Sequence, residues 1–393
     1  METSRRGFLA ATGAGALGAL ALKGLGSSRA KAAPAPKAGA TIDRTLAWVW
    51  RWSDDGDPVA IRDRLAQLQM AAMVKTNDGT SWMSRWDRSQ GAMSGPPQVR
   101  EIADYFEAAG VPFHAWGVTR GTDPTGEAQI AAEVLASGAR SFTFDLEPPE
   151  GNSYWHGSPD SAARLGEELR KIAPKAYLAV TPDPRPWRVA MVPLTEFAGF
   201  SNEIMPQTYW RIFDSPSNHR RLNQSGFATS EVNPRNILHI SNLVLQKYGR
   251  TLRPIGQADA SREEWLWFLQ EAHALGMAAP SFWRFRTAEP GMWQAFEELR
   301  AQQEAESQAK TQAQAQPPAQ APAQTQARQA TQVPNDPNLS QPQAAGTAEA
   351  PPVSENTPGV DPDNLRNPYG AGPRFKTQYE ITRRLPGFEG VFE

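Results

Sequence analysis

Eight short apolar segments alternate with amphipathic segments between residues 46 and 300, and this alternation restricts the possible fold more than any other feature of the sequence. Short apolar runs bounded by turn residues indicate buried strands, whereas apolar positions three and four residues apart indicate helices. The expected strands are 46–50, 71–75, 113–118, 141–147, 177–181, 203–209 and 281–285, with either 237–240 or 252–256 as the seventh. The expected helices are 61–70, 99–110, 127–138, 162–172, 263–275 and 292–300.

Eight strand–helix units within about 250 residues are typical of a (β/α)8 TIM barrel. The alternative α/β fold is a doubly wound open sheet, which would place a glycine-rich nucleotide loop after the first strand. Residues 50–55 read Trp-Arg-Trp-Ser-Asp-Asp and contain no glycine. The sequence therefore predicts an α/β protein with a (β/α)8 barrel over residues 42–300.

The composition excludes several functional classes. Forty Lys and Arg against 42 Asp and Glu give a net charge of −2, which argues against a nucleic-acid-binding protein. The absence of Cys excludes disulfides, Cys-ligated zinc and thiol catalysis. The five His are not spaced as ligands on one helix face, so we expect no metal site and no other cofactor.

The N-terminus has the pattern of an export signal. Arg5 and Arg6 precede an Ala/Gly-rich apolar run, and residues 30–32 read Ala-Lys-Ala, a small-x-small cleavage site. No stop-transfer pattern follows. Residues 1–32 are therefore predicted to be a twin-arginine signal peptide, and the mature protein to be periplasmic or extracellular, with no membrane span after cleavage.

The C-terminal part of the chain has a different composition. Gln and Ala occupy 27 of the 50 positions from 301 to 350, and no aromatic residue occurs between residues 298 and 368. Such a segment buries too little apolar surface to offset the conformational entropy lost on folding, so residues 301–368 are predicted to form a disordered linker. Residues 369–393 regain Tyr, Phe and Leu and could dock on the main domain, contact an envelope partner or remain free.

The strongest chemical signal lies in the fourth expected strand, which contains Asp145 and Glu147. Residues i and i+2 of a strand point to the same face, so both carboxyls should face the barrel axis, with Glu147 nearer the mouth. Two carboxyls so close resist joint ionisation, which raises the pKa of one of them, and Glu147 is the expected one. A carboxylic acid that stays protonated near neutral pH is what glycoside cleavage requires.

These residues resemble motifs of the (β/α)8 glycoside hydrolase families 18 and 25. Family 18 has D-x-D-x-E at the end of the fourth strand; here Asp145 and Glu147 match the last two acids and Thr143 replaces the first. Gln207-Thr208-Tyr209 is similar to a Gln-x-Tyr on the sixth strand, and Trp283 to a Trp on the eighth. Residues 75–80, Lys-Thr-Asn-Asp-Gly-Thr, resemble a turn after the second strand of family 25, whose first-strand Asp has no counterpart here.

The resemblance implies roles for particular residues. In family 18 chemistry Glu147 protonates the leaving oxygen, while Asp145 and Tyr209 orient a substrate N-acetyl group that acts as nucleophile. In family 25 chemistry Glu147 is again the acid, assisted by Asp145 or Asp78. The candidate catalytic residues are therefore Glu147, Asp145 and Tyr209, and the candidate substrate-binding residues are Gln207, Trp283, Trp50, Trp116, Asp78 and Lys75.

Tryptophans near strand ends are candidate platforms for sugar rings, because aromatic faces stack on the apolar side of a pyranose. Alternation along the first strand predicts that Trp48, Trp50 and Trp52 share one face. His114, in the interior of a strand, is expected to be a hydrogen-bonded core residue.

Three functions are compatible with these observations. The leading hypothesis is an exported glycoside hydrolase acting on a cell-envelope or environmental polysaccharide. The second is a catalytically silent barrel that binds glycans as a lectin, and the third is a structural envelope protein tethered to a partner through its tail. The carboxyls at 145 and 147 favour the first.

Overall fold

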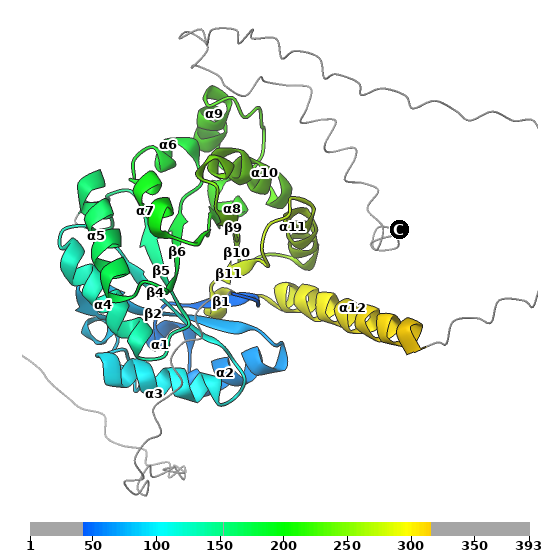
Figure 1. The fold of residues 1–393 in the computed structure, drawn as a ribbon. Coiled ribbons are helices and arrows are strands. Elements are labelled where there is room, and N and C mark those ends of the chain that lie inside the picture. The colour runs from blue at the N-terminus through cyan, green and yellow to red at the C-terminus, as the bar shows by residue number, and fades with distance from the viewer. Residues whose placement is uncertain (1–41, 152, 316–393) are drawn as a thin grey trace, which may run out of the picture. The chain divides into compact units, whose positions relative to one another are not determined.

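The computed structural model describes residues 42–151 and 153–315. The expected signal peptide, most of the expected linker and residues 369–393 lie outside the described residues. The described part of the chain confirms the predicted (β/α)8 barrel: parallel strands form a ring and helices surround them (Figure 1).

The barrel strands pair in parallel around the ring. In chain order they are β1 (Leu46–Val49), β2 (Ala71–Asp78), β4 (Phe113–Val118), β5 (Ser141–Leu146), β6 (Tyr177–Pro182), β7 (Glu203–Ile204), β8 (Gln207–Thr208), β9 (Thr251–Leu252), β10 (Ile255–Gln257) and β11 (Ser281–Trp283). A short β3 (Ser81–Trp82) pairs antiparallel with β2. The ring closes because β11 pairs with β1.

The sixth and seventh barrel strands are each split into two segments. β7 pairs with β6 and β9, whereas β8 pairs with β10. The breaks fall at Pro206 and Pro254, which have no backbone N–H to donate to a ladder. The seventh strand therefore corresponds to the second of the two expected segments, and the alternative, residues 237–240, lies in helix α10 (Pro234–Leu245).

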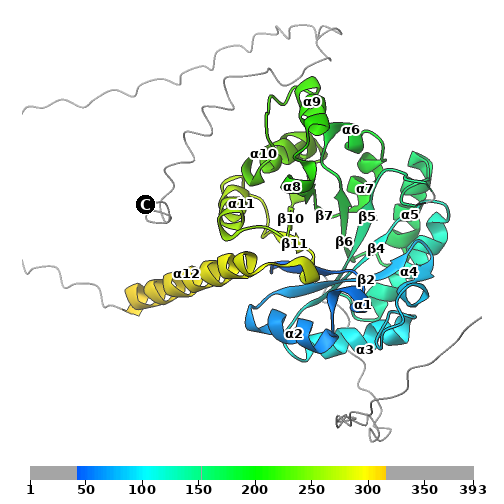
Figure 2. The ribbon, with the colours of Figure 1, turned by 180° about the vertical axis from the view of Figure 1, so that it is seen from behind.

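The helices that follow the strands form the outer ring (Figures 1 and 2). They are α1 (Trp52–Asp55), α2 (Pro58–Gln67), α3 (Pro96–Glu107), α4 (Pro124–Ala136), α5 (Pro159–Ile172), α6 (Pro186–Val189), α7 (Leu194–Phe200), α8 (Trp210–Phe213), α9 (Pro216–Gln224), α10, α11 (Arg262–Ala274) and α12 (Pro290–Ala315). No helix in the described residues is both long enough and apolar enough to cross a membrane.

Five of these helices begin with the same local signal, a capping side chain followed by proline. The cap accepts a hydrogen bond from the first turn, and proline at the first helical position loses no intrahelical bond. The pairs are Asp57-Pro58, Asp123-Pro124, Ser158-Pro159, Ser215-Pro216 and Asn233-Pro234. Helix starts are thus fixed locally by the sequence.

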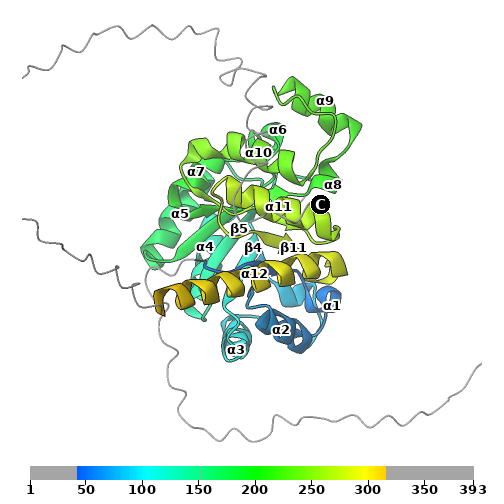
Figure 3. The same ribbon diagram turned by 90° about the vertical axis from the view of Figure 1, so that its right-hand side faces the viewer.

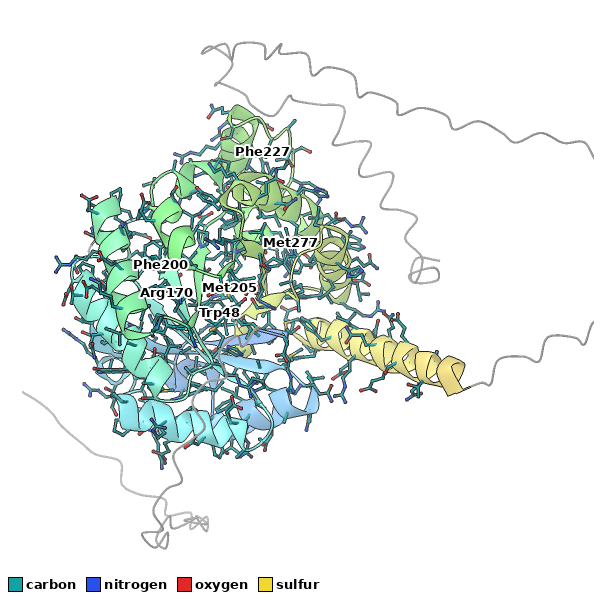
Figure 4. The ribbon with its side chains drawn as sticks, viewed as in Figure 1. Trp48, Arg170, Phe200, Met205, Phe227 and Met277 are labelled. Carbon is teal, nitrogen blue, oxygen red and sulfur yellow. The ribbon has the colours of Figure 1, made fainter. Side chains whose placement is uncertain are left out.

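Alternation along the strands divides the apolar side chains into two layers. Inward residues such as Trp48 and Met205 form a cluster inside the barrel. Outward residues such as Val49 and Phe144 pack against the helices. Figure 4 shows Trp48 and Met205 near the middle of the barrel and Phe200 farther out, on α7.

The barrel interior also contains a buried ion pair near the N-terminal ends of the strands. Arg253 and Glu203 are almost fully buried, and the guanidinium donates to both carboxylate oxygens, at 3.0 and 3.1 Å. The same guanidinium donates to the carbonyls of Ile42 and Ala279. Nearby, the imidazole of His114 lies 2.8 Å from the Ser141 hydroxyl, which agrees with the expected structural role.

Helix α12 continues to Ala315, beyond the expected end at residue 300. Its first turns pack on α11 through Trp265 and Phe296, whose ring centroids are 5.1 Å apart (Figure 3). Its last turns extend away from the barrel (Figure 1). The first part of the expected linker is therefore helical, because Ala, Gln and Glu, which give it low complexity, also favour helices.

Two glycines, one on α5 and one on α7, offer a test of how these two helices pack together. A Cβ at Gly166 on α5 would lie 2.1 Å from Phe200, whereas a Cβ at Gly199 on α7 would meet no atom within 4 Å. Gly166→Ala should therefore lower the free energy of unfolding by about 1–3 kcal/mol through overpacking. Gly199→Ala, the matched control, should raise it by about 0.5–1 kcal/mol. Urea unfolding measures both, and shifts in the same direction would contradict the packing of α5 on α7.

Candidate functional site

A pocket of about 480 Å³ opens at the C-terminal ends of the barrel strands. This is the end of a (β/α)8 barrel where functional groups collect. All nine candidate site residues line it: Trp50, Lys75, Asp78, Trp116, Asp145, Glu147, Gln207, Tyr209 and Trp283. The fold thus brings the candidates together from six barrel strands and the loops that follow them, while their roles remain predictions.

The carboxyls of Asp145 and Glu147 both line the pocket, as expected for residues two apart along a strand. Asp145, inside β5, is buried, and Glu147, one residue beyond the strand, is half-buried. The side-chain amide of Gln207 donates to Asp145 Oδ1 and to Glu147 Oε1, at 3.1 Å each. One amide from β8 therefore holds both carboxyls in a single cluster.

Burial controls the protonation of this cluster. Burial raises the pKa of Asp145 well above its usual range, and the charge of Glu147 adds to the effect. Burial also raises the pKa of Glu147, against the opposing hydrogen bond from Gln207. The pKa values of both carboxyls are therefore raised, and that of the deeper Asp145 is raised strongly. The sequence pattern had predicted a raised pKa for Glu147.

Two phenols face the carboxyls. Burial and then the charges of Glu147 and Asp145 raise the pKa of Tyr209 well above its usual value. The same causes, in the same order, raise the pKa of Tyr154 to about 12. Both phenols are therefore protonated at neutral pH and able to donate hydrogen bonds to a ligand in the pocket.

Three tryptophans form an aromatic wall. The ring centroids of Trp48, Trp116 and Trp283 are 5.3 to 6.1 Å apart. Trp48 and Trp116 are each 2% exposed, and their indole N–H groups donate to Ser281 and Val49, so both rings are fixed. Trp283 is half-buried and presents more of its surface to the pocket.

The other tryptophans divide between pocket and core. Trp50 lines the pocket, and guanidinium carbons of Arg51 and Arg284 lie 3.9 and 4.9 Å from its ring centroid. The expectation that Trp52 shares its face was wrong, because β1 ends at Val49 and Trp52 begins α1, where it packs on Phe106. Trp155 and Trp210 lie in the outer core.

Lys75 and Asp78 form part of a charged chain on the β2 side of the pocket. The Lys75 ammonium lies 3.2 Å from Asp78 Oδ2, and Asp78 Oδ1 lies 2.7 Å from the guanidinium of Arg120. One carboxylate is thus shared by two cations.

Thr181 and Tyr154 are among the pocket residues that were not candidates. Thr181 lies opposite Asp145 in the β5–β6 ladder, and its buried hydroxyl has no hydrogen-bond partner within the described residues. Tyr154 enters from the loop after β5, where Trp155 is buried against Phe197. The signals available in sequence were a hydroxyl at the end of the fifth strand and an aromatic pair after the Asp-x-Glu strand.

The described residues contain no group of three or more His, Asp or Glu side chains arranged to hold a metal ion. The chemistry available in the pocket is that of carboxyls, phenols, one primary amide and buried cations.

Comparison with solved structures finds chitinases and related glycosidases. The catalytic domain of a chitinase from Pyrococcus furiosus is 11% identical, with 66% of this chain and 96% of that chain covered and a TM-score of 0.45. A chitinase from Chromobacterium violaceum is 9% identical, with coverage of 65% and 98% and a TM-score of 0.46. A glycoside hydrolase family 18 N-acetylglucosaminidase from Paenibacillus barengoltzii is 10% identical, with coverage of 65% and 99% and a TM-score of 0.46. No protein-family model and no curated protein sequence matches the chain.

The raised pKa of Asp145 predicts a dependence of stability on pH. The folded protein binds this proton more tightly than the unfolded chain, so the carboxyl destabilises the fold increasingly as pH rises above its unfolded pKa of about 4. Asp145→Asn should therefore raise the thermal midpoint at pH 7 by a few degrees, and by less at pH 3.5. Asp104→Asn, on the exposed face of α3, is the control. An equal shift of the thermal midpoint at both pH values would contradict the raised pKa of Asp145.

Proposed function

We propose that this protein is a glycoside hydrolase and that Glu147 is its general acid. The observation that carries the proposal is the carboxyl pair itself: Asp145 and Glu147 share the amide of Gln207 in a pocket walled by tryptophans, and burial raises the pKa of both. A carboxylic acid that remains protonated near neutral pH can donate a proton to a leaving glycosidic oxygen.

The positions of the groups suggest how the work is divided. Glu147 is nearer the mouth and would protonate the leaving oxygen. Asp145 and Tyr209 would orient an N-acetyl group of the substrate, whose carbonyl oxygen attacks the anomeric carbon in place of a protein nucleophile. Trp283 would support the sugar ring, and Tyr154 would donate a hydrogen bond beside the departing sugar.

The substrate proposed is a polysaccharide of the cell envelope or the environment that contains N-acetylhexosamine. This fits a chain exported through the twin-arginine pathway into the periplasm or beyond. The Gln/Ala/Pro-rich tail would then hold the enzyme near an envelope partner.

The export proposal has a direct test. Arg5→Lys with Arg6→Lys should abolish export, because the paired guanidinium groups are the recognised feature of such signals. Cell fractionation measures the distribution, with Arg44→Lys, outside residues 1–32, as the control. Export of the double variant at the normal level would contradict the proposal.

The catalytic proposal is tested by release of reducing ends from peptidoglycan, chitin and other polysaccharides. Glu147→Gln should lower kcat by about 10²- to 10⁴-fold, the usual contribution of a positioned general acid. Glu101→Gln is the control, because Glu101 is exposed on α3 and does not line the pocket. Glycan binding by the Glu147 variant should persist.

The outcomes separate the two main functions. Hydrolysis by Glu147→Gln at the wild-type rate would exclude this mechanism. A wild-type protein that binds glycans but hydrolyses none would instead be a lectin. That alternative is favoured by one observation: the position two residues before Asp145 holds Thr143, whose hydroxyl lies 3.9 Å from the sulfur of Met205.

A further inference from the structure

Arg284 lies in the wall of the pocket, one residue beyond β11. Its side chain is 16% exposed and lines the pocket together with Trp50 and Trp283. Its guanidinium carbon lies 4.9 Å from the centroid of the Trp50 ring, which is within the range of a cation–π contact. Stacking of this kind uses the planar face of a guanidinium, so the N–H groups along its edge stay available to donate.

Asp55 holds this guanidinium from behind the pocket wall. Nη1 of Arg284 lies 3.2 Å from Oδ2 of Asp55, whose carboxylate is fully buried and does not line the pocket. The same carboxylate accepts hydrogen bonds from the backbone N–H groups of Trp50, Arg51 and Arg286. Because these contacts join the ends of β1 and β11, Arg284 is already ordered and loses little conformational freedom when a ligand binds.

The acidic partner of Arg284 distinguishes it from the neighbouring cations of the pocket. Lys75 and Arg120 both pair with Asp78, a carboxylate that itself lines the pocket. Arg284 pairs instead with a carboxylate outside the pocket. Its positive charge is therefore presented to a ligand without an acid beside it on the same wall.

The carboxyl pair on the far wall repels an anion less than two exposed carboxylates would. Burial raises the pKa of Asp145 and of Glu147, which favours their uncharged forms. An anionic ligand can therefore enter the pocket and reach Arg284.

Arg284 and Glu147 lie on opposite sides of the barrel mouth. Glu147 follows the fourth barrel strand, β5, and Arg284 follows the eighth, β11, so three strands separate them in either direction around the ring. A group bound at Arg284 is therefore not the oxygen that Glu147 would protonate. Its contribution is to the choice of substrate rather than to the reaction itself.

We propose that Arg284 binds a carboxylate carried by the glycan, which makes it the residue that selects acidic polysaccharides over neutral ones. The inference rests on the proposed function in one respect, that the ligand is a glycan. A guanidinium matches the planar carboxylate through two parallel N–H···O hydrogen bonds, a geometry that an uncharged ester does not offer.

Two sources can supply a carboxylate beside an N-acetylhexosamine. Peptidoglycan strands carry it on the lactyl group of their muramyl sugars, and other polysaccharides carry it on the ring of a uronate. The test therefore uses two probes, peptide-free peptidoglycan fragments and oligosaccharides that alternate N-acetylhexosamine with uronate, each as the free acid and as the methyl ester.

Isothermal titration calorimetry on the full-chain Glu147→Gln protein, in which hydrolysis is slowed, measures binding of both probes. For at least one probe the free acid should bind about tenfold or more tightly than its ester, the effect of one hydrogen bond between charged groups. The probe that shows this difference identifies the source of the carboxylate. Equal affinities of acid and ester for both probes, or no binding of either acid, would overturn the proposal.

A second substitution assigns the difference to Arg284. Arg284→Met in the same protein should remove the preference for the acid and change the affinity for the ester less than about threefold. Asp55 keeps its three backbone donors in this variant, so its buried carboxylate is not left without partners. Arg284→Lys, which keeps a cation beside Asp55 but lacks the planar fork, should retain only part of the preference.

Arg164→Met is the matched control, because Arg164 is exposed on α5 and does not line the pocket. It should leave the preference for the acid unchanged. A preference that persists in Arg284→Met would overturn the role of Arg284, and near-UV circular dichroism verifies that each variant is folded. A wild-type protein that hydrolyses no glycan would refute the proposed function, while the comparison of acid with ester would still decide whether Arg284 binds a carboxylate.

Discussion

Closure of the barrel depends on the buried guanidinium of Arg253, which joins the beginnings of several strands. It pairs with Glu203 at the start of β7 and donates to the carbonyls of Ile42, before β1, and Ala279, before β11. Buried carbonyls without partners are costly, and a guanidinium offers donors in a fixed planar arrangement that can satisfy several of them. One side chain therefore holds together the sixth, seventh, eighth and first strands, where the ladders are shortest.

With that end closed by charge and hydrogen bonds, the opposite end can remain open and polar. The inward layer that contains Trp48, Met73 and Met205 separates the two ends. Above it Asp145, Glu147 and Lys75 are buried enough to have shifted pKa values and are still in contact with the pocket. The shifts are a consequence of the barrel, because its strands bring charges from different parts of the chain into one poorly hydrated space.

Much of this arrangement was predictable from local patterns. The apolar runs gave the strands, and the spacing of Asp145 and Glu147 placed both carboxyls on one face. Residues 237–240 were ambiguous because a short apolar run suits a strand or a buried helix, and the Asn233-Pro234 cap decides for the helix. Residues 301–315 have the low complexity typical of disorder, but they continue α12, because Ala, Gln and Glu also have high helix propensity.

The sequence by itself determined the barrel class, seven of its eight strands and nine of the residues that line the pocket, because these follow from alternation and from the ends of strands. Only the tertiary structure decided which of those residues touch. The hydrogen bonds from Gln207 to both carboxyls and the place of Thr181 opposite Asp145 depend on the register between strands. Register is set by the packing of the whole ring, and no local stretch of sequence contains it.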